Sequence, residues 1–416
     1  MEHSVTWTCT GCALLCEDIQ VIINNNKIEK VENACLKGKG RLFGCKHPAR
    51  STINQVDADI SEAISQAVRM LKESEHPLLY GWSNSTSEAQ CAGIELAHTL
   101  GAVIDSTSSF CQGLTINEII TNNLPACTLE DVREKADVIM YWGADPMSSH
   151  PRHLSKYSYY PRGEMRQRGY EEDRTAICID VRQSRTAKIC KDKFYMIPAK
   201  GDAEFIKGLM DGLSGRVPKL DYEFDIKRIL ELAAILKKAE FGVIFVGLGL
   251  IYSIKSQMQL LLELINKLNE FSNFYLIPMA GHFNMRGFNH NMFEKTGFVH
   301  RVKFANEGIR SGIEFSVIEQ LKNGADAAVI VGSDPLTSLP TSVSKRLKNI
   351  PVILIDPCMN LTSKVADITI PCSVSGIEVG GTAIRLDGQT QKISSLIESS
   401  CMSDELIIRR IIEELD

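Results

Sequence analysis

The sequence lacks a strong excess of charge of either sign. Its 416 residues include 46 Lys and Arg against 51 Asp and Glu, which leaves a formal net charge of −5. Proteins that bind nucleic acid or anionic lipid through their overall field are usually basic, so we expect neither partner. A membrane span is also missing, because the longest apolar run, Phe241–Ile251, is shorter than the about 20 residues that cross a bilayer.

The first residues, MEHSVTWTCTGC, have neither the basic start nor the apolar core of a secretory signal. We therefore expect a cytoplasmic protein, in a compartment that keeps thiols reduced. Hydrophobic residues make up 44% of the chain and charged residues 23%. This composition excludes a disordered or collagen-like chain, and the length predicts two or three packed cores.

Cysteine is the residue type whose positions are most informative. The chain has 13 cysteines, an odd number, and four of them fall in the first 35 residues. Cys9, Cys12 and Cys16 form a C-x2-C-x3-C run. Cys35 comes after Val21–Val31, whose pattern predicts a small hairpin with an Asn-rich turn. Such local density indicates metal ligation rather than scattered buried thiols.

Four thiolates from a tight loop and one more distant segment suit a [4Fe-4S] cluster. Zinc is the competing metal, since four cysteines also complete a tetrahedral shell. The paired C-x2-C knuckles of most zinc sites are missing, because the second half supplies a single cysteine. Zinc therefore ranks below iron–sulfur, and four unmetallated core cysteines rank lower still. Cys45 is a weaker rival to Cys35 for the fourth position.

From Pro77 onward, apolar runs rich in β-branched residues alternate with stretches of helical periodicity. One of these stretches begins with Ser87, and Gln90 follows three residues later, as in a capping box. The alternation predicts mainly parallel sheets with helices on both faces, which is the α/β class. The expected strands are Pro77–Trp82, Ala102–Asp105, Asp137–Trp142, Ala176–Asp180, Phe241–Gly247, Phe274–Pro278, Ala327–Val331 and Val352–Asp356.

Two distant parts of the chain share one pattern. DVIMYWGADPMSSHP followed by ICIDVRQSRTAKICKDKFYMIP matches AAVIVGSDPLTSLP followed by VILIDPCMNLTSKVADITIP. Each copy has a strand ending in Gly-x-Asp-Pro, a strand ending in Asp, a Thr and a Lys near a helix start, and a short strand ending in Ile-Pro. This repeat predicts two related αβα lobes, with ligands beyond the carboxyl ends of their strands.

The cysteine spacing, with Cys-x-Lys-Gly after it, resembles the iron–sulfur head of the molybdopterin-guanine-dinucleotide oxidoreductases. More narrowly, YWGADPMSSHPRHLSKYS, YPRGEMRQRGYEEDRT, FVGLGL and GHFNMRGFN resemble the B subunits of tungsten or molybdenum formylmethanofuran dehydrogenases. The resemblance extends over essentially the whole chain. It implies reversible reduction of CO2 to formate, with a [4Fe-4S] cluster, two molybdopterin guanine dinucleotides and tungsten or molybdenum as cofactors.

The resemblance implies that Cys111 is the thiolate ligand of tungsten or molybdenum. Cys111 follows the strand predicted to end at Asp105, and Thr115 with Glu118 predicts a capping box for the next helix. The positive end of a helix favours a thiolate. The family usually has His at the next position, whereas this chain has Gln112, which cannot shuttle a proton.

Arg286 is the residue expected to hold the carboxylate of formate, because a guanidinium matches two carboxylate oxygens. A surface ion pair is the alternative reading of Arg286. His282 reads equally well as a catalytic group and as a core histidine. Arg152 and its two neighbouring histidines, His150 and His153, could bind phosphate or organise an interface between lobes.

The remaining expected site residues would hold the cofactors. Lys37 is expected between cluster and pterin, and the others follow strand ends, where glycine N–H groups could approach a pyrophosphate and carboxylates could bind guanine or ribose. The full set is Lys37, Trp142, Gly143, Asp145, Asp180, Arg182, Thr186, Gly247, Gly249, Gly332, Ser333, Asp334 and Asp356.

The expected domains are a cluster domain over residues 1–52, a first α/β lobe over 53–240 and a second lobe over 241–416. Segments 53–76 and 280–320 are expected to pack across lobes. The superfamily's C-terminal β-barrel has no room in the chain, so a separate β-barrel subunit is expected to complete the pterin site.

The other partners that the resemblance implies are an amidohydrolase-like subunit, which condenses formate with methanofuran, and a polyferredoxin or ferredoxin donor. Two alternative functions stay open. One is another molybdopterin formate dehydrogenase-like oxidoreductase, and the other is a redox-inactive scaffold of a formyltransferase/hydrolase complex.

Overall fold

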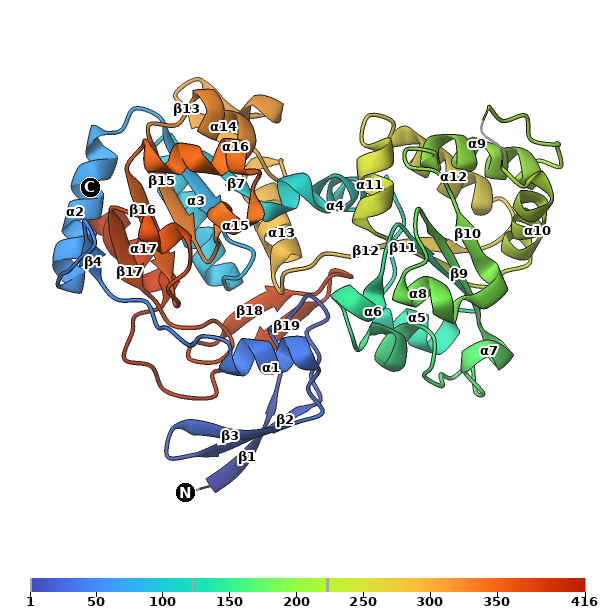
Figure 1. Cartoon of the computed structure of the whole chain (residues 1–416), viewed down its shortest axis with the longest axis horizontal. Coiled ribbons are helices and arrows are strands. Elements are labelled where there is room, and N and C mark those ends of the chain that lie inside the picture. Colours follow the sequence, from blue (N-terminus) through green and yellow to red (C-terminus); the bar gives the residue numbers. More distant parts are fainter. Residues whose placement is uncertain (1, 122, 222–223, 416) are drawn as a thin grey trace. The chain divides into compact units, whose positions relative to one another are not determined.

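The computed structural model of the chain describes residues 2–121, 123–221 and 224–415. They form two compact units, coloured by sequence in Figure 1. Unit 1 comprises Met1–Gly113, His282–Arg385 and Thr390–Asp416, and unit 2 comprises Leu114–Gly281 and Leu386–Gln389.

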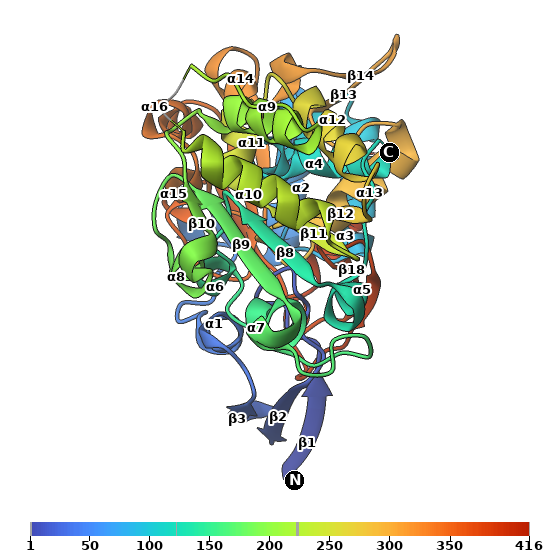
Figure 2. The same cartoon turned by 90° about the vertical axis from the view of Figure 1, so that its right-hand side faces the viewer.

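Unit 2 is built on a five-stranded sheet in which every strand pairing is parallel. Its central strands β8 and β9 lie side by side in Figure 2. Every residue of β8 is buried, as expected for a strand covered on both faces. In sheet order the strands are β10 (Phe194–Met196), β9 (Thr175–Asp180), β8 (Val138–Trp142), β11 (Gly242–Val246) and β12 (Phe274–Pro278). The helices are α5 (Leu129–Lys135), α6 (Pro146–Ser149), α7 (Tyr170–Asp173), α8 (Arg185–Ile189), α9 (Asp202–Leu213), α10 (Ile226–Lys237), α11 (Leu248–Ile254) and α12 (Gln259–Leu268), and α4 (Gly113–Ile120) begins in unit 1.

Unit 1 contains a nine-stranded sheet with a parallel centre and antiparallel edges. Side chains of β15 alternate between two cores: Val329 and Val331 pack on one face, and Ala328 and Ile330 on the other. In sheet order the strands are β14 (Gly308–Ser311), β13 (Val302–Ala305), β7 (Val103–Ser106), β6 (Pro77–Gly81), β15 (Ala327–Val331), β16 (Val352–Asp356), β17 (Ile368–Pro371), β4 (Thr52–Ile53) and β5 (Val56–Asp57). The helices are α1 (Leu36–Phe43), α2 (Ile60–Glu73), α3 (Ser87–Thr99), α13 (Met285–Thr296), α14 (Val317–Asn323), α15 (Pro335–Ser338), α16 (Thr341–Ser344) and α17 (Asp404–Leu415).

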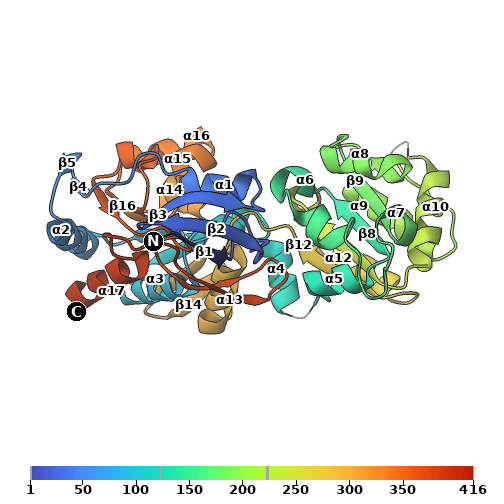
Figure 3. The ribbon, with the colours of Figure 1, turned by 90° about the horizontal axis from the view of Figure 1, so that it is seen from below.

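The beginning of the chain forms a small antiparallel sheet of its own, in which three strands lie side by side (Figure 3). The predicted hairpin is confirmed, and its turn places Asn25 and Asn26 at positive φ. These strands are β1 (Glu2–Trp7), β2 (Ile19–Asn24) and β3 (Lys27–Glu32), and a separate hairpin consists of β18 (Gly381–Ile384) and β19 (Thr390–Ile393).

All eight predicted strands are present, and no bound differs from the prediction by more than one residue. The mixed α/β fold with mainly parallel sheets is confirmed. The helix predicted to open at Ser87 is α3, and its N-cap is Thr86, whose hydroxyl accepts a hydrogen bond from the Ala89 N–H. No helix within the described residues is both long and apolar enough to cross a membrane.

The units divide the chain differently from the expected linear lobes. β11, expected in the second lobe, pairs with β8 of unit 2, whereas β6, expected in the first lobe, pairs with β15 of unit 1. Residues 60–73 and 282–320 both belong to unit 1. Strand pairing over long sequence separations therefore sets the units, and a reading along the chain cannot see it.

The repeated segments form the same local structure in both units. In unit 2, Asp145 Oδ1 accepts hydrogen bonds from the Thr186 N–H at 3.1 Å and hydroxyl at 2.6 Å. In unit 1, Asp334 Oδ1 accepts from the Thr362 N–H at 3.0 Å and hydroxyl at 2.6 Å. We call this contact the Asp–Thr bridge. It ties the loop after one strand to the segment after the next strand.

The bridge predicts a specific loss of stability. Thr362 is fully buried, so Thr362→Ala removes a hydrogen bond to a carboxylate and should lower the free energy of unfolding by about 2 kcal/mol. The matched control Thr337→Ala, at an exposed position of α15, should change it by less than about 0.5 kcal/mol. Urea unfolding of the full chain measures both, and equal effects would contradict the assignment.

Candidate functional site

The first three cysteines lie in a loop that closes on itself. The Cys9 N–H donates to the Cys16 carbonyl at 2.9 Å, and the Leu15 N–H donates to the Cys12 carbonyl at 3.2 Å. Leu15 has a φ of 43°, a left-handed conformation that turns the loop. The side chains of all three cysteines are buried. The loop thus presents three thiols from within one short turn.

The segment carrying Cys35 packs against this loop backbone to backbone. A Cβ atom added at Gly11 would lie 2.9 Å from the Lys37 carbonyl oxygen. One added at Gly38 would lie 3.0 Å from Cys9 Sγ, whereas the Gly11 N–H donates to that same sulfur at 3.4 Å. Glycine is therefore needed at both positions for the two segments to meet.

The four cysteines interact electrostatically with one another. Burial, with the neighbouring cysteines adding to it, raises the pKa of Cys9 and of Cys12 to about 12. A bound metal would reverse this effect, because a coordinating thiol is deprotonated. No three Cys, His, Asp or Glu side chains of the described residues converge as ligands of a single ion would. The four cysteines nevertheless lie close enough to act on one another's charge.

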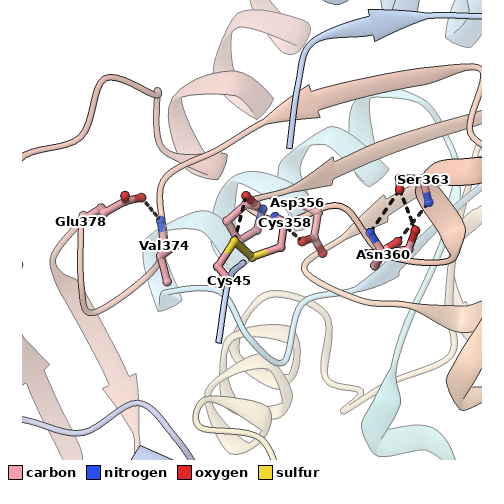
Figure 4. Close-up of a disulfide and its surroundings, with 8 residues drawn as sticks. Cys45, Asp356, Cys358, Asn360, Ser363, Val374 and Glu378 are labelled. Atoms are coloured by element: carbon pink, nitrogen blue, oxygen red, sulfur yellow. Dashed lines mark hydrogen bonds between the residues drawn. A yellow bond between two sulfur atoms is a disulfide. The ribbon is translucent and has the colours of Figure 1, made fainter. Parts of the chain in front are cut away.

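Cys45 has a different role from the one expected. It forms a disulfide with Cys358, next to the strand end at Asp356 (Figure 4). Its role as a rival to Cys35 is therefore wrong, because its sulfur is already bonded. The bond also departs from the expectation that the thiols of this chain are all reduced. It joins the segment after α1 to the loop after β16.

A cavity of about 360 Å³ lies in unit 1 beyond the carboxyl ends of the parallel strands. This is the position at which open α/β sheets bind ligands, and the volume is within the usual range for ligand pockets. The Gly332 loop borders it, and a Cβ at Gly332 would meet no atom closer than 3.6 Å. Residues of the cavity wall include Arg41, Asn84, Ser85, Thr107, His282, Gly332, Ser333, Asp334, Asp356, Ser373 and Asp404.

Two cationic side chains of α1 connect the cysteine loop with this cavity. The charge of Lys37 acts on Cys12 and on His282, so Lys37 lies near both. Arg41 lines the cavity and donates to the Ser375 carbonyl at 3.0 Å. Partial desolvation, and then the charges of Lys37 and Arg41, lower the pKa of His282, although part of its side chain remains exposed. His282 is thus a neutral cavity residue, and its Nδ1 lies 3.3 Å from Asn84 Oδ1.

Cys111 follows a short 3₁₀ helix, η1 (Thr107–Phe110), and its N–H donates to the Ser108 carbonyl at 2.9 Å. Thr107 of this helix reaches the cavity wall. The predicted capping box is wrong, because α4 already begins at Gly113 and Thr115 lies inside it. Cys111 nevertheless comes directly before the positive end of that helix, as expected.

Arg286 lies in the first turn of α13 and is only 4% exposed, which excludes the surface ion pair. Its Nε donates to His290 Nε2 at 3.2 Å. Burial, and then the charge of Arg286, lowers the pKa of His290 to about 4, so His290 accepts as a neutral ring. Gln112 is fully buried.

In unit 2 the expected cofactor residues form a second group. Asp145 and Thr186 make the Asp–Thr bridge, and Asp180 Oδ1 accepts from the N–H of exposed Arg182 at 3.2 Å. Trp142 is different: it is fully buried, and its indole N–H donates to Asp202 at 2.7 Å. Trp142 thus belongs to the core of unit 2.

Four glycines whose N–H groups were expected to bind a pyrophosphate use these groups within the fold. The N–H groups of Gly143, Gly247, Gly249 and Gly332 all donate to backbone carbonyls, so the predicted free donors for a pyrophosphate are not there. Gly247 is needed for packing, because its Cβ would lie 1.9 Å from the Gly143 carbonyl oxygen.

The two histidines of HPRH are fully buried in unit 2. His150 Nε2 lies 2.7 Å from the Ala280 carbonyl oxygen, and His153 Nδ1 lies 3.0 Å from the Ser158 hydroxyl. Burial lowers the pKa of His153 well below its usual value. Both rings are buried and each contacts a polar group within unit 2, so these side chains fix the local fold.

Several residues of the cavity wall were not among the site residues predicted from the sequence. Asn84 and Ser85 follow β6 in the polar run SNSTS, which could have been read as a strand-end site. Arg41, Ser373 and Asp404 come from segments with no shared motif. Only the fold brings them together.

Asp356 predicts a pH dependence of stability. Burial raises its pKa from 3.8 to about 7, against the opposing effects of the Cys358 N–H and Arg41. Between about pH 4 and pH 7 the folded state holds a proton on Asp356 that the unfolded state has lost. The stabilisation that Asp356 contributes is therefore full below about pH 4 and disappears as the pH rises to about 7. Measured against Asp356→Asn, the free energy of unfolding of wild type should fall by up to about 4 kcal/mol over this range. Urea unfolding between pH 4 and 7 measures this dependence. The control Asp57→Asn should keep the wild-type slope of the free energy of unfolding against pH. If Asp356→Asn also has the wild-type slope, the assignment is contradicted.

No family model matches the chain. It is 32% identical to the B subunit of the tungsten-containing formylmethanofuran dehydrogenase 2 of Methanocaldococcus jannaschii, over 98% of this chain and 97% of the relative. The protein of the same name from Methanococcus maripaludis is 31% identical, over 100% and 99%. The formyltransferase/hydrolase complex (FhcABCD) of Methylorubrum extorquens, solved with methylofuran, has a chain of the same fold, with a TM-score of 0.71, 22% identity and coverage of 88% of this chain and 98% of that one. The chain therefore belongs to the family of formylmethanofuran dehydrogenase B subunits.

Proposed function

We propose that the chain is the catalytic subunit of a formylmethanofuran dehydrogenase, which reduces CO2 to formate reversibly. The observation that carries this proposal is the combination, within unit 1, of four clustered cysteines, the Cys111 turn and buried Arg286. The reaction consumes one proton and two electrons for each CO2 converted to formate. Tungsten or molybdenum with two pterins, and a [4Fe-4S] cluster, would supply the redox chemistry when bound.

Cys9, Cys12, Cys16 and Cys35 would hold the cluster. Their backbone supports this role, because the Gly11 N–H already points to the Cys9 sulfur, and such hydrogen bonds stabilise thiolate charge. Lys37 lies near Cys12 and would favour a more negative, reduced state through its charge.

The unit 1 cavity would hold part of a pterin dinucleotide. Asp356 and Asp334 offer carboxylate oxygens that can accept hydrogen bonds from guanine or ribose, and Arg41 offers a positive charge for a phosphate. The equivalent residues of unit 2, Asp145 and Asp180 with Arg182, would serve the second dinucleotide. Gly332 and Ser333 would make van der Waals contact with the ligand, because the Gly332 N–H is already used within the fold. The other members of the set, Trp142, Thr186, Gly143, Gly247 and Gly249, would support this part of the site.

Cys111 would be the protein ligand of the heavy metal. Arg286 would orient the carboxylate, since its guanidinium is buried and its Nε is fixed by His290. A buried, permanently charged fork binds a carboxylate more strongly than an exposed one. His282 is the cavity residue that would complete the polar surroundings.

The chain would work in a hetero-oligomer. A β-barrel subunit would complete the pterin site, an amidohydrolase-like subunit would condense formate with methanofuran, and a polyferredoxin or ferredoxin would supply electrons. A redox-inactive scaffold is the second candidate, favoured by the fold shared with a formyltransferase/hydrolase complex. The cysteine cluster argues against it, because a scaffold does not need ligands for a redox cluster.

The Cys111→Ala variant tests the proposal. It should abolish CO2 reduction and formate oxidation by the purified complex, because the metal loses its protein ligand, and the iron content should stay near the wild-type value. Elemental analysis and a viologen-linked assay measure both. Loss of iron together with activity would identify Cys111 as a structural cysteine, and Cys91→Ala, in α3, is the matched control with full activity.

Arg286→Lys gives a second test. Lysine keeps the charge but not the planar fork, so kcat/KM for formate should fall by about 10- to 100-fold. Lys295→Arg, near the end of the same helix, should leave kcat/KM unchanged. A wild-type value for Arg286→Lys would rule out carboxylate recognition by this side chain.

A further inference from the structure

A buried histidine lies beside the Cys111 turn with unused hydrogen-bonding capacity. His300 is 7% exposed, and neither Nδ1 nor Nε2 has a hydrogen-bond partner among the described residues. Its ring fills the space that a side chain at position 113 would take: a Cβ at Gly113 would lie 2.3 Å from His300 Cδ2 and 2.6 Å from Nε2. The imidazole therefore packs directly against the backbone that follows Cys111 and Gln112.

The backbone around His300 is held on both sides. The Val299 carbonyl accepts from Asn289 Nδ2 at 2.7 Å, and the Arg301 N–H donates to the Asp105 carboxylate at 3.2 Å. The same carboxylate accepts from the Ser109 hydroxyl of η1 at 2.9 Å. Asp105 thus links the turn that precedes Cys111 to the residue after His300, and the position of the ring relative to this turn is fixed.

The unpaired ring is energetically costly. A polar group that is buried without a partner destabilises the folded state, and unsatisfied groups in native proteins are few. Asn289 Oδ1 is also buried without a partner, whereas Asn289 Nδ2 donates to the Ser108 hydroxyl at 2.8 Å. Two unsatisfied groups therefore flank the same 3₁₀ helix. The His300 ring and Asn289 Oδ1 thus indicate that a small polar ligand, such as water, binds beside this helix.

His300 is a neutral imidazole. Burial, and then the charge of Arg301, lowers the pKa of His300 to about 3. One nitrogen of a neutral ring donates and the other accepts, so the ring can take a proton on one side while releasing one from the other. Gln112, the residue next to Cys111, has no group that can do this.

We propose that His300, with water held near Asn289, relays the proton that CO2 reduction consumes at the Cys111 site. The proton enters at one ring nitrogen, another leaves from the second nitrogen toward the site, and the ring is neutral before and after. The electrons come from the electron donor of the proposed function, on which this inference rests. His300 acts as a proton-transfer residue and needs no contact with the metal.

The test uses the intact complex with a viologen as electron donor or acceptor. His300→Ala and His300→Phe should both lower kcat by about 100-fold, because general acid–base transfer contributes about 100- to 10,000-fold, while the contents of iron and of tungsten or molybdenum stay at wild-type values. Imidazole should restore activity to His300→Ala but not to His300→Phe, whose ring fills the space. Exposed His98→Ala is the matched control, with the wild-type rate.

A second measurement does not depend on catalysis. If water reaches the ring, imidazole should enter the space left in His300→Ala and raise the Tm of that variant but not of wild type. Near-wild-type kcat for His300→Phe, or absence of rescue and of a Tm shift in His300→Ala, would overturn the relay.

The two proposals fail separately. If the wild-type complex neither reduces CO2 nor oxidises formate, the proposed function fails. If the wild type is active, Cys111→Ala is inactive and His300→Phe is as fast as wild type, only the relay fails.

Discussion

The buried carboxylate of Asp105, at the end of β7, is the contact on which the candidate site depends most. It accepts hydrogen bonds from the Ser109 hydroxyl of η1, the Arg301 N–H and the Val317 N–H of α14. The Ser109 and Val317 donors would be buried without a partner if the carboxylate were lost, at about 1–3 kcal/mol each. A single side chain thereby fixes the turn before Cys111 against two segments that lie about two hundred residues away in sequence.

The other elements of unit 1 follow the same logic, because backbone contacts hold chemistry-bearing side chains in place. The cysteine loop meets the Lys37–Gly38 segment through glycines, and Arg41 extends from the same helix to the cavity. Asn284 accepts from the Ile384 N–H and donates to the Ser85 carbonyl, so it holds the start of α13 next to the cavity. The cysteines, the cavity and Arg286 therefore belong to one compact unit.

Much of the fold could be predicted from sequence, since buried parallel strands such as β8 are continuous apolar runs and need no knowledge of their neighbours. The repeat was visible because both copies follow a strand with Gly-x-Asp-Pro and place a Thr after the next strand, although the spacing from Asp to Thr is 41 residues in one copy and 28 in the other. The division of the chain into units could not be predicted, because the pairing of β8 with β11 has no signature in the sequence of either strand. The glycines after β8 and β11 read as phosphate-binding motifs, but their N–H groups are used within the fold. His300 has no motif at all, and only its unsatisfied ring reveals it.

The most direct test of the central claim, a heavy-metal redox site fed by the cysteine cluster of this chain, is metal and nucleotide analysis of the purified complex. We expect about four iron atoms per chain bound by Cys9, Cys12, Cys16 and Cys35, together with tungsten or molybdenum and guanine nucleotide released on denaturation. Iron without tungsten, molybdenum or guanine nucleotide, or no iron at all, would contradict it.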